Sequence, residues 1–200
     1  KFDILGLATL RIIENAISRV LVKGGNSNPS FRDIKDFYDK NLHPASINFE
    51  DQKVYEEVFH QGKWAAIFQF AEKGAQEFCK RAKPRSIIDL SAITSIYRPG
   101  PLSAKVDENY VAAKEQPESI KYLHPIVEEI TRETAGFLIF QEQIALIAHK
   151  LGKDLSLDEG NLLRKVLTKK GTGKGHEVKD GIHTKFIEGC LEKGIKQEDA

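Results

Sequence analysis

Methionine is absent from the 200-residue sequence, and cysteine occurs only twice. Because an intact chain would begin with methionine, we expect this sequence to be a piece of a longer protein. Cys79 and Cys190 lie far apart and belong to no paired motif, so a disulfide framework or a zinc knuckle has no support. The six histidines show no His-x-x-x-His spacing, and we assign no metal to any of them.

Long apolar runs are also missing, because charged residues interrupt them every few positions. We therefore expect neither a transmembrane helix nor a membrane partner, and the N-terminus lacks the pattern of a signal peptide. A cytoplasmic location follows by default. A composition of 40% hydrophobic and 30% charged residues is typical of a soluble globular chain, with length for one sizeable core or slightly more.

Apolar residues recur at helical spacing along most of the chain, which predicts a mainly α fold with short connectors. Ser30 is placed to cap one of these helices, and Gly24 and Gly152 are placed to end two others. The expected helices cover residues 9–22, 31–38, 51–60, 72–83, 87–97, 103–115, 125–132, 141–151, 157–170 and 182–193.

Two short stretches favour extended structure instead. Residues 64–70 are rich in aromatic and β-branched side chains, and residues 1–7 alternate with a period of two until Gly6. Asp3 would lie at the end of the second stretch, off its apolar face and beside Lys1. Active-site groups often gather at such positions. This stretch by itself nevertheless favours a solvated turn acid.

The net charge of +1 conceals two basic clusters. The first, at one helix end, consists of Lys80, Arg81, Lys83 and Arg85. The second, within residues 161–185, consists of Arg164, Lys165, Lys169, Lys170, Lys174, Lys179 and Lys185. Acids are few in the second cluster, which favours contact with phosphate over an ordinary solvated face.

A rotation of about 100° per residue divides the helix of the second cluster into two faces. Leu162 and Leu163 are expected on the packed face, and Arg164 and Lys165 on the opposite one. Guanidinium and ammonium groups form charge-assisted hydrogen bonds with phosphate oxygens. The cationic strip therefore suits a polyphosphate or a nucleic-acid backbone.

Of three further motifs, two remain ambiguous. Residues 98–101 (Arg-Pro-Gly-Pro) form a rigid corner that could be structural or functional. Residues 141–143 (Gln-Glu-Gln) are typical of helix-capping groups. Residues 171–175 do not form a P-loop, because no strand precedes them and no glycine lies at the required spacing; we interpret them as a basic loop.

Taken together, five motifs resemble the bacterial DNA polymerase III alpha subunit, the C-family replicase, in their order and approximate spacing. The motifs are Lys1-Phe2-Asp3-Ile4-Leu5-Gly6-Leu7; Ile67-Phe68-Gln69 followed by Gly74; Tyr97-Arg98-Pro99-Gly100-Pro101-Leu102; Gly136 with Phe140-Gln141-Glu142-Gln143; and Leu162-Leu163-Arg164-Lys165 through Lys169-Lys170. The resemblance implies a mainly α fold, with a helical fingers domain and a small strand-containing palm remnant at the N-terminus. Residues 1–22 would end the palm, with its last catalytic strand and the following helix, and residues 23–200 would form the fingers.

The resemblance also implies the chemistry: template-directed nucleotidyl transfer from a deoxynucleoside triphosphate to a primer 3′-hydroxyl. Asp3 would be the catalytic, metal-binding carboxylate of a two-magnesium site, and hard oxygen ligands suit magnesium. Lys1, Arg98, Arg164 and Lys165 would bind the nucleotide. Phosphate of nucleotide or template would meet Lys169, Lys170 and Lys174. Since the remaining carboxylates would lie upstream of Lys1, the piece alone should not polymerise.

Primer–template DNA and deoxynucleoside triphosphates are the implied partners, with a sliding clamp and a proofreading exonuclease reached through the complete chain. Two departures from the family pattern are Lys165, where arginine is usual, and residues 66–72, whose turn has lost a glycine and an acid. The alternative function is a non-catalytic helical module that binds nucleic acid or protein. A helix-turn-helix regulator fits the helix spacing less well.

Overall fold

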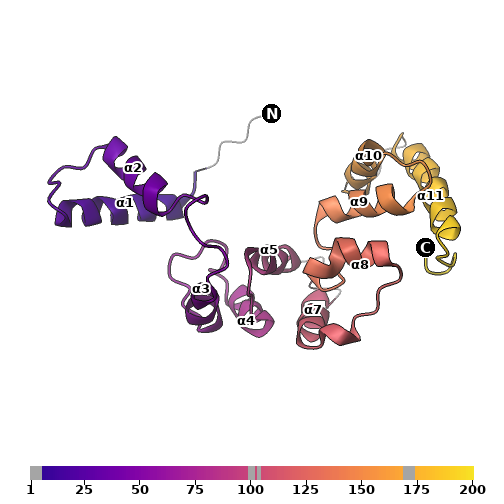
Figure 1. Ribbon diagram of the computed structural model, residues 1–200, viewed down its shortest axis with the longest axis horizontal. Helices are drawn as coiled ribbons and strands as arrows, with labels where there is room; N and C mark the ends of the chain where they lie inside the picture. The colour runs from indigo at the N-terminus through magenta and orange to yellow at the C-terminus, as the bar shows by residue number, and fades with distance from the viewer. Residues whose placement is uncertain (1–5, 99–101, 103–104, 169–173) are drawn as a thin grey trace. The chain divides into compact units, whose positions relative to one another are not determined.

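The computed structural model describes residues 6–98, 102, 105–168 and 174–200 (Figure 1). The chain divides into two compact units, Lys1–Ile87 and Ile88–Ala200. The described residues contain helices and no strand, so the mainly α prediction is confirmed. The predicted N-terminal strand falls mostly on residues 1–5, which lie outside the described residues. Gly6 and Leu7 lead into the first helix, and no strand-containing palm remnant is seen in the described part.

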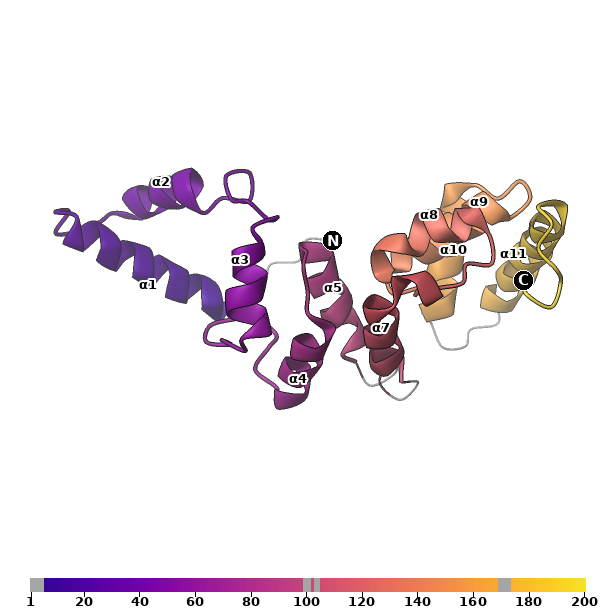
Figure 2. The same cartoon turned by 60° about the horizontal axis from the view of Figure 1, so that its bottom comes forward.

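The helices of the first unit are α1 (Ala8–Lys23), α2 (Phe31–Asn41), α3 (Gln52–Val54) and α4 (Lys73–Ala82). α3 continues directly as a π-helix, η1 (Tyr55–His60). α1 lies beside α2 (Figure 2). Ser30 caps α2 as predicted: its hydroxyl accepts a hydrogen bond from the Asp33 N–H at 3.2 Å, and its own N–H donates to the Asp33 carboxylate at 2.8 Å.

Aromatic rings form the core beside η1. The Phe59 ring lies 6.2 Å from Tyr55, 6.4 Å from Trp64 and 6.1 Å from Phe70, measured between ring centroids. Trp64 and Phe70 stack nearly parallel at 5.4 Å. Phe78 of α4 is also fully buried. Large flat side chains therefore pack against one another in this part of the first unit.

The prediction of extended structure at residues 64–70 is wrong. These residues form successive turns, and Ala66 and Gln69 adopt left-handed backbone angles with φ of 61° and 64°. Regular strand backbone has negative φ, so two such angles within four residues interrupt a strand. The physical reason is that Trp64 and Phe70 fold back onto Phe59, so their aromatic character serves a compact cluster instead of a sheet.

The second unit follows from α5 (Ile87–Ile96), which begins at the boundary between the units. Its other helices are α7 (Val106–Glu115), α8 (Pro125–Thr131), α9 (Gln141–Leu151), α10 (Leu157–Thr168) and α11 (Lys174–Glu192), with short 3-10 turns at Pro117–Ser119 and Arg132–Thr134. The basic loop predicted at residues 171–175 is partly wrong. Residues 171–173 lie outside the described residues, but Lys174 and Gly175 already belong to α11.

A partly buried polar contact joins α7 to α5. The Tyr110 hydroxyl donates to Asp89 at 3.2 Å, and the Lys114 ammonium lies 2.6 Å from the other oxygen of the same carboxylate. Burial, and then the neighbouring Asp89 charge, raise the pKa of Tyr110 above its ordinary value. Tyr110 therefore remains a neutral hydrogen-bond donor.

Two glycines let helices of the second unit approach at backbone distance. A Cβ atom added to Gly160 of α10 would lie 2.5 Å from the Ala145 carbonyl oxygen of α9. One added to Gly189 of α11 would lie 2.2 Å from the Leu151 carbonyl oxygen. Both distances are too short for any side chain. Leu151, Cys190 and Ile195 complete the core where α9 and α11 meet.

No helix in the described ranges is both long and apolar enough to cross a membrane.

Candidate functional site

The candidate site is the part of α10 that carries the adjacent bases Arg164 and Lys165. Lys165 is exposed, whereas Arg164 is half-buried and its Nε atom is buried. The Nη1 atom of Arg164 donates a hydrogen bond to the side-chain oxygen of Gln141, the first residue of α9. The structure thus joins two motifs that lie 23 residues apart in the sequence.

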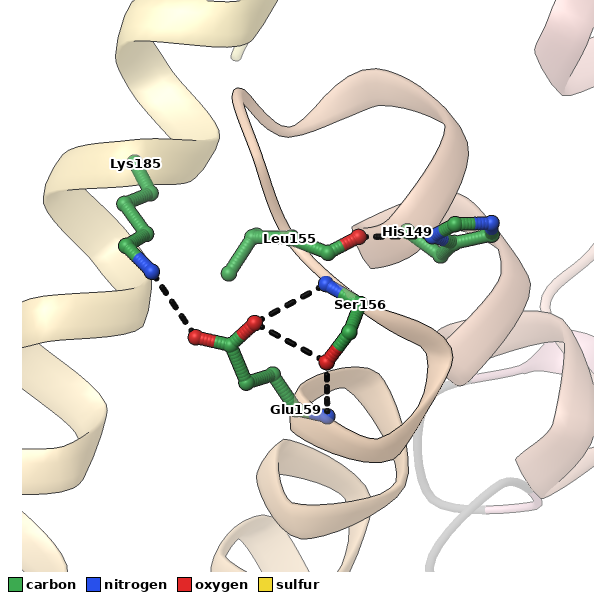
Figure 3. A network of polar contacts seen from close by, with 5 residues as sticks. All are labelled: His149, Leu155, Ser156, Glu159 and Lys185. Atoms are coloured by element: carbon green, nitrogen blue, oxygen red, sulfur yellow. Dashed lines mark hydrogen bonds and ion pairs between the residues drawn. The ribbon is translucent and has the colours of Figure 1, made fainter.

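A reciprocal cap fixes the beginning of α10 (Figure 3). The Ser156 N–H and hydroxyl donate to one Glu159 carboxylate oxygen at 2.9 and 3.0 Å, and the Ser156 oxygen accepts from the Glu159 N–H at 3.2 Å. The pattern satisfies amide groups that the first helical turn leaves without partners.

The same carboxylate ties α10 to α11. Lys185 donates to the second Glu159 oxygen at 2.8 Å, as Figure 3 shows. This bond, followed by the contributions of Ser156, lowers the pKa of Glu159 to about 2. Glu159 is therefore ionised throughout the neutral range, and α10 is linked to α11 by a charge-assisted contact.

The connection from α9 to α10 is fixed at two further points. His149 Nδ1 lies 2.6 Å from the Leu155 carbonyl oxygen, a contact in which the ring nitrogen is the donor. The N–H of Lys153 donates to the Lys185 carbonyl oxygen at 2.9 Å. Together with the close approach of Gly160 to Ala145, these contacts set the position of α10 against α9.

The beginning of α9 is fixed by Gln143, which is buried. Its side-chain oxygen accepts from the Ile139 and Phe140 N–H groups at 2.8 and 2.9 Å. Its amide nitrogen donates to Thr134 at 2.8 Å and to the Ile130 carbonyl at 3.1 Å. The capping prediction for residues 141–143 is confirmed for Gln143, whereas the Gln141 side chain extends to Arg164 instead.

The predicted packed face of α10 needs correction. Leu162 was expected to pack but is 43% exposed, whereas Gly160 is buried and Arg164 is half-buried. The reason is that α9 meets α10 at Gly160, where backbone approaches backbone. A glycine adds nothing to a hydrophobic pattern, so the pattern did not indicate this contact; Leu163, also expected on the packed face, is half-buried.

The remaining predicted site residues divide into two groups. Arg98 is exposed just after α5, and Lys174 is the first residue of α11. The others lie outside the described residues: Lys1, Asp3, Lys169 and Lys170. Over the described ranges, no group of three or more His, Cys, Asp or Glu residues is arranged to hold a metal ion.

Residues important to this site were missed at the level of sequence. Ser156 and Glu159 form a readable capping pattern that could have been found. The link from Glu159 to Lys185 and the contact from Gln141 to Arg164 join residues on different helices, and no local pattern indicates them.

Comparison with known proteins defines the class. Residues 28–194 match the family model of the bacterial DNA polymerase III alpha subunit finger domain. The whole chain is 36% identical to DNA polymerase III subunit alpha of Borreliella burgdorferi and 35% identical to that of Treponema pallidum. Over 99% of its length it is 33% identical to the same subunit of Staphylococcus aureus strain COL. It spans 15 to 16% of these relatives.

The chain belongs to the bacterial DNA polymerase III alpha subunit family, and its matched region is the finger domain.

Proposed function

We propose that the chain is the nucleotide-handling finger region of a replicative DNA polymerase. Its complete chain would join a deoxynucleotide to a primer: the 3′-oxygen bonds to the α-phosphorus, and the bond from that phosphorus to the departing pyrophosphate breaks. Arg164 and Lys165 would neutralise the triphosphate. The observation that carries this proposal is the Gln141–Arg164 contact, which joins two family motifs at one basic surface.

The chemistry of the two bases suits this role. Negative charge accumulates on the pyrophosphate as it departs, and cations positioned nearby stabilise that charge in the transition state. Arg164 presents a planar fork from a half-buried position, where electrostatic attraction is less screened than in bulk water. Lys165 is exposed and would act as a point charge.

Magnesium would be bound by the complete chain, with Asp3 as one ligand and carboxylates from outside this sequence as the others. Bound magnesium would activate the 3′-hydroxyl and stabilise the pyrophosphate. Among the described residues, no group of three or more His, Cys, Asp or Glu side chains is placed to hold this metal. On this proposal the 200-residue piece alone is inactive.

The other predicted contacts belong to the same proposal. Lys1 and Arg98 would bind the nucleotide, and Lys169, Lys170 and Lys174 would meet phosphate of nucleotide or template. Primer–template DNA and deoxynucleoside triphosphates would be the direct partners. A sliding clamp and a proofreading exonuclease would act through the rest of the chain, in the cytoplasm.

The proposal is tested with Arg164→Ala in the complete polymerase chain. Loss of charge-assisted hydrogen bonds should lower kcat/KM for the nucleotide by about 10- to 100-fold. Single-nucleotide incorporation on a primed template measures this, with DNA affinity measured separately. Arg132→Ala is the matched control, because Arg132 is an exposed arginine paired with Glu128 on the surface. Wild-type kinetics in Arg164→Ala would contradict the proposal.

A further inference from the structure

We infer that Gln141 is a positioning residue that holds the Arg164 guanidinium in place for the triphosphate. The inference rests on the nucleotide-binding role proposed above for Arg164 and extends it to a residue on another helix. It starts from one contact: the Gln141 side-chain oxygen accepts a hydrogen bond from Arg164 Nη1.

This contact is not needed to form the first turn of α9. Gln143 already accepts the Ile139 and Phe140 N–H groups at the start of that helix. Gln141 is exposed at the first helical position, and its side chain extends away from its own helix to α10. The Gln141 side chain therefore serves to bind Arg164 and not to cap α9.

Both ends of the contact have a fixed backbone. On α9, Gln143 lies two residues after Gln141; it is buried and donates hydrogen bonds to the Ile130 carbonyl and to Thr134. On α10, Ser156 and Glu159 cap the helix, and Gly160 meets Ala145 at backbone distance. A hydrogen bond between two such anchors restricts the rotamers of a long side chain before any ligand arrives.

Restricting Arg164 in advance lowers the entropy lost when a triphosphate binds. Immobilising one long side chain corresponds to about a 2- to 10-fold change in affinity. The benefit appears in nucleotide binding and not in folding, because the contact is exposed at the surface.

A neutral amide suits this position better than a carboxylate. An amide oxygen orients the guanidinium and leaves its positive charge available to phosphate. A glutamate at position 141 would form an ion pair with Arg164 and compete with phosphate for the same charge. Glutamate should therefore impair nucleotide binding more than removal of the side chain does.

The test measures nucleotide KM and kcat for the complete polymerase chain carrying Gln141→Ala, Gln141→Met or Gln141→Glu. Gln141→Met keeps the length of the side chain and removes its oxygen. We expect Gln141→Ala and Gln141→Met to raise KM by about 2- to 10-fold with kcat within about twofold of wild type. Gln141→Glu should raise KM further. Added salt should reduce the difference in KM between Gln141→Glu and Gln141→Ala, because salt screens the added charge.

A double-mutant cycle separates positioning from an independent effect. Gln141→Ala combined with Arg164→Ala should be no worse than Arg164→Ala alone, since the amide acts only through the arginine. Glu142→Ala is the matched control on the same exposed turn and should leave KM unchanged. Thermal melting should be unchanged in all Gln141 variants.

Two outcomes would overturn the inference alone. One is a wild-type KM in Gln141→Ala while Arg164→Ala is impaired, and the other is full additivity in the double variant. A wild-type KM in Arg164→Ala would instead overturn the proposed nucleotide role, and this inference with it.

Discussion

The two units are packed in different ways. In the first unit, rings of Tyr55, Phe59, Trp64 and Phe70 meet at centroid distances between 5.4 and 6.4 Å. In the second unit, glycines allow helix backbones to meet with no space for a side chain. The second unit also has a ring contact, between Tyr110 and Phe137 at 6.1 Å, but its helices α9, α10 and α11 approach one another through glycines. The candidate site lies in the second unit, on the helix whose Gly160 meets the α9 backbone at Ala145.

The ring-packed first unit should be most sensitive to lost volume. Phe78→Ala should destabilise it by about 3–5 kcal/mol, because Phe78 is 1% exposed and its removal leaves a cavity. Urea unfolding followed by Trp64 fluorescence measures the effect in this unit. Phe68→Ala is the control: Phe68 is 53% exposed, and its loss should cost less than about 1 kcal/mol. Equal shifts for the two variants would show that ring packing does not dominate the stability of this unit.

The second unit should be most sensitive to added volume. Gly189→Ala places a methyl group 2.2 Å from the Leu151 carbonyl oxygen, so α11 must shift, at a cost of about 1–3 kcal/mol. Gly181 lies on the same helix with nothing within 4 Å of an added methyl group, so Gly181→Ala should instead stabilise by about 0.5–1 kcal/mol. Urea unfolding followed by circular dichroism measures both. Effects of the same sign would contradict the prediction.

The smallest effect concerns the capping acids. The pKa of Glu159 is about 2 in the folded chain against an ordinary 4.5. Ionised Glu159 therefore stabilises the folded state above about pH 5, and this stabilisation is lost as pH falls toward 2. In Glu159→Gln, the stability of the folded state should fall less as pH is lowered from 5 to 2. In the first unit the pKa of Asp33 is also lowered, chiefly by hydrogen bonds from Ser30, with smaller contributions from Asn26 and the Arg32 charge, whereas the hydrogen bond from Lys185 is the largest cause for Glu159.

Asp33→Asn should therefore flatten the stability profile less than Glu159→Gln does. The measurement is the urea midpoint between pH 2 and 6, repeated in high salt, which should weaken the contribution of Lys185. A larger effect for Asp33→Asn would show that the serine, and not the lysine, controls the titration.

Local patterns predicted the helices well. The expected helix at residues 141–151 is α9 itself, and the expected helix at residues 9–22 differs from α1 by one residue at each end. Apolar spacing and capping residues carry this information along a single segment. They do not show that the aromatic residues 64–70 cluster, or that α11 already begins at Lys174.

The candidate site was only half predictable. Arg164 and Lys165 stand out because few acids accompany the bases of their segment, which is a local property of the sequence. Gln141 does not stand out, because its partner lies on another helix. The role of Gly160 could not be predicted for a similar reason. Its lack of a side chain lets α10 approach Ala145 of α9, and only the three-dimensional structure shows that these helices meet there.

The π-helix η1 has a consequence for chain length. A π-turn holds one more residue than an α-turn, so it absorbs a single inserted residue without rotating the helix on either side. Deleting one residue between Tyr55 and His60 should return the segment to α-helical pitch and leave the contact between His60 and the Pro84 carbonyl, now 2.8 Å, in register. Alignments of this family are therefore expected to tolerate a one-residue gap at this position.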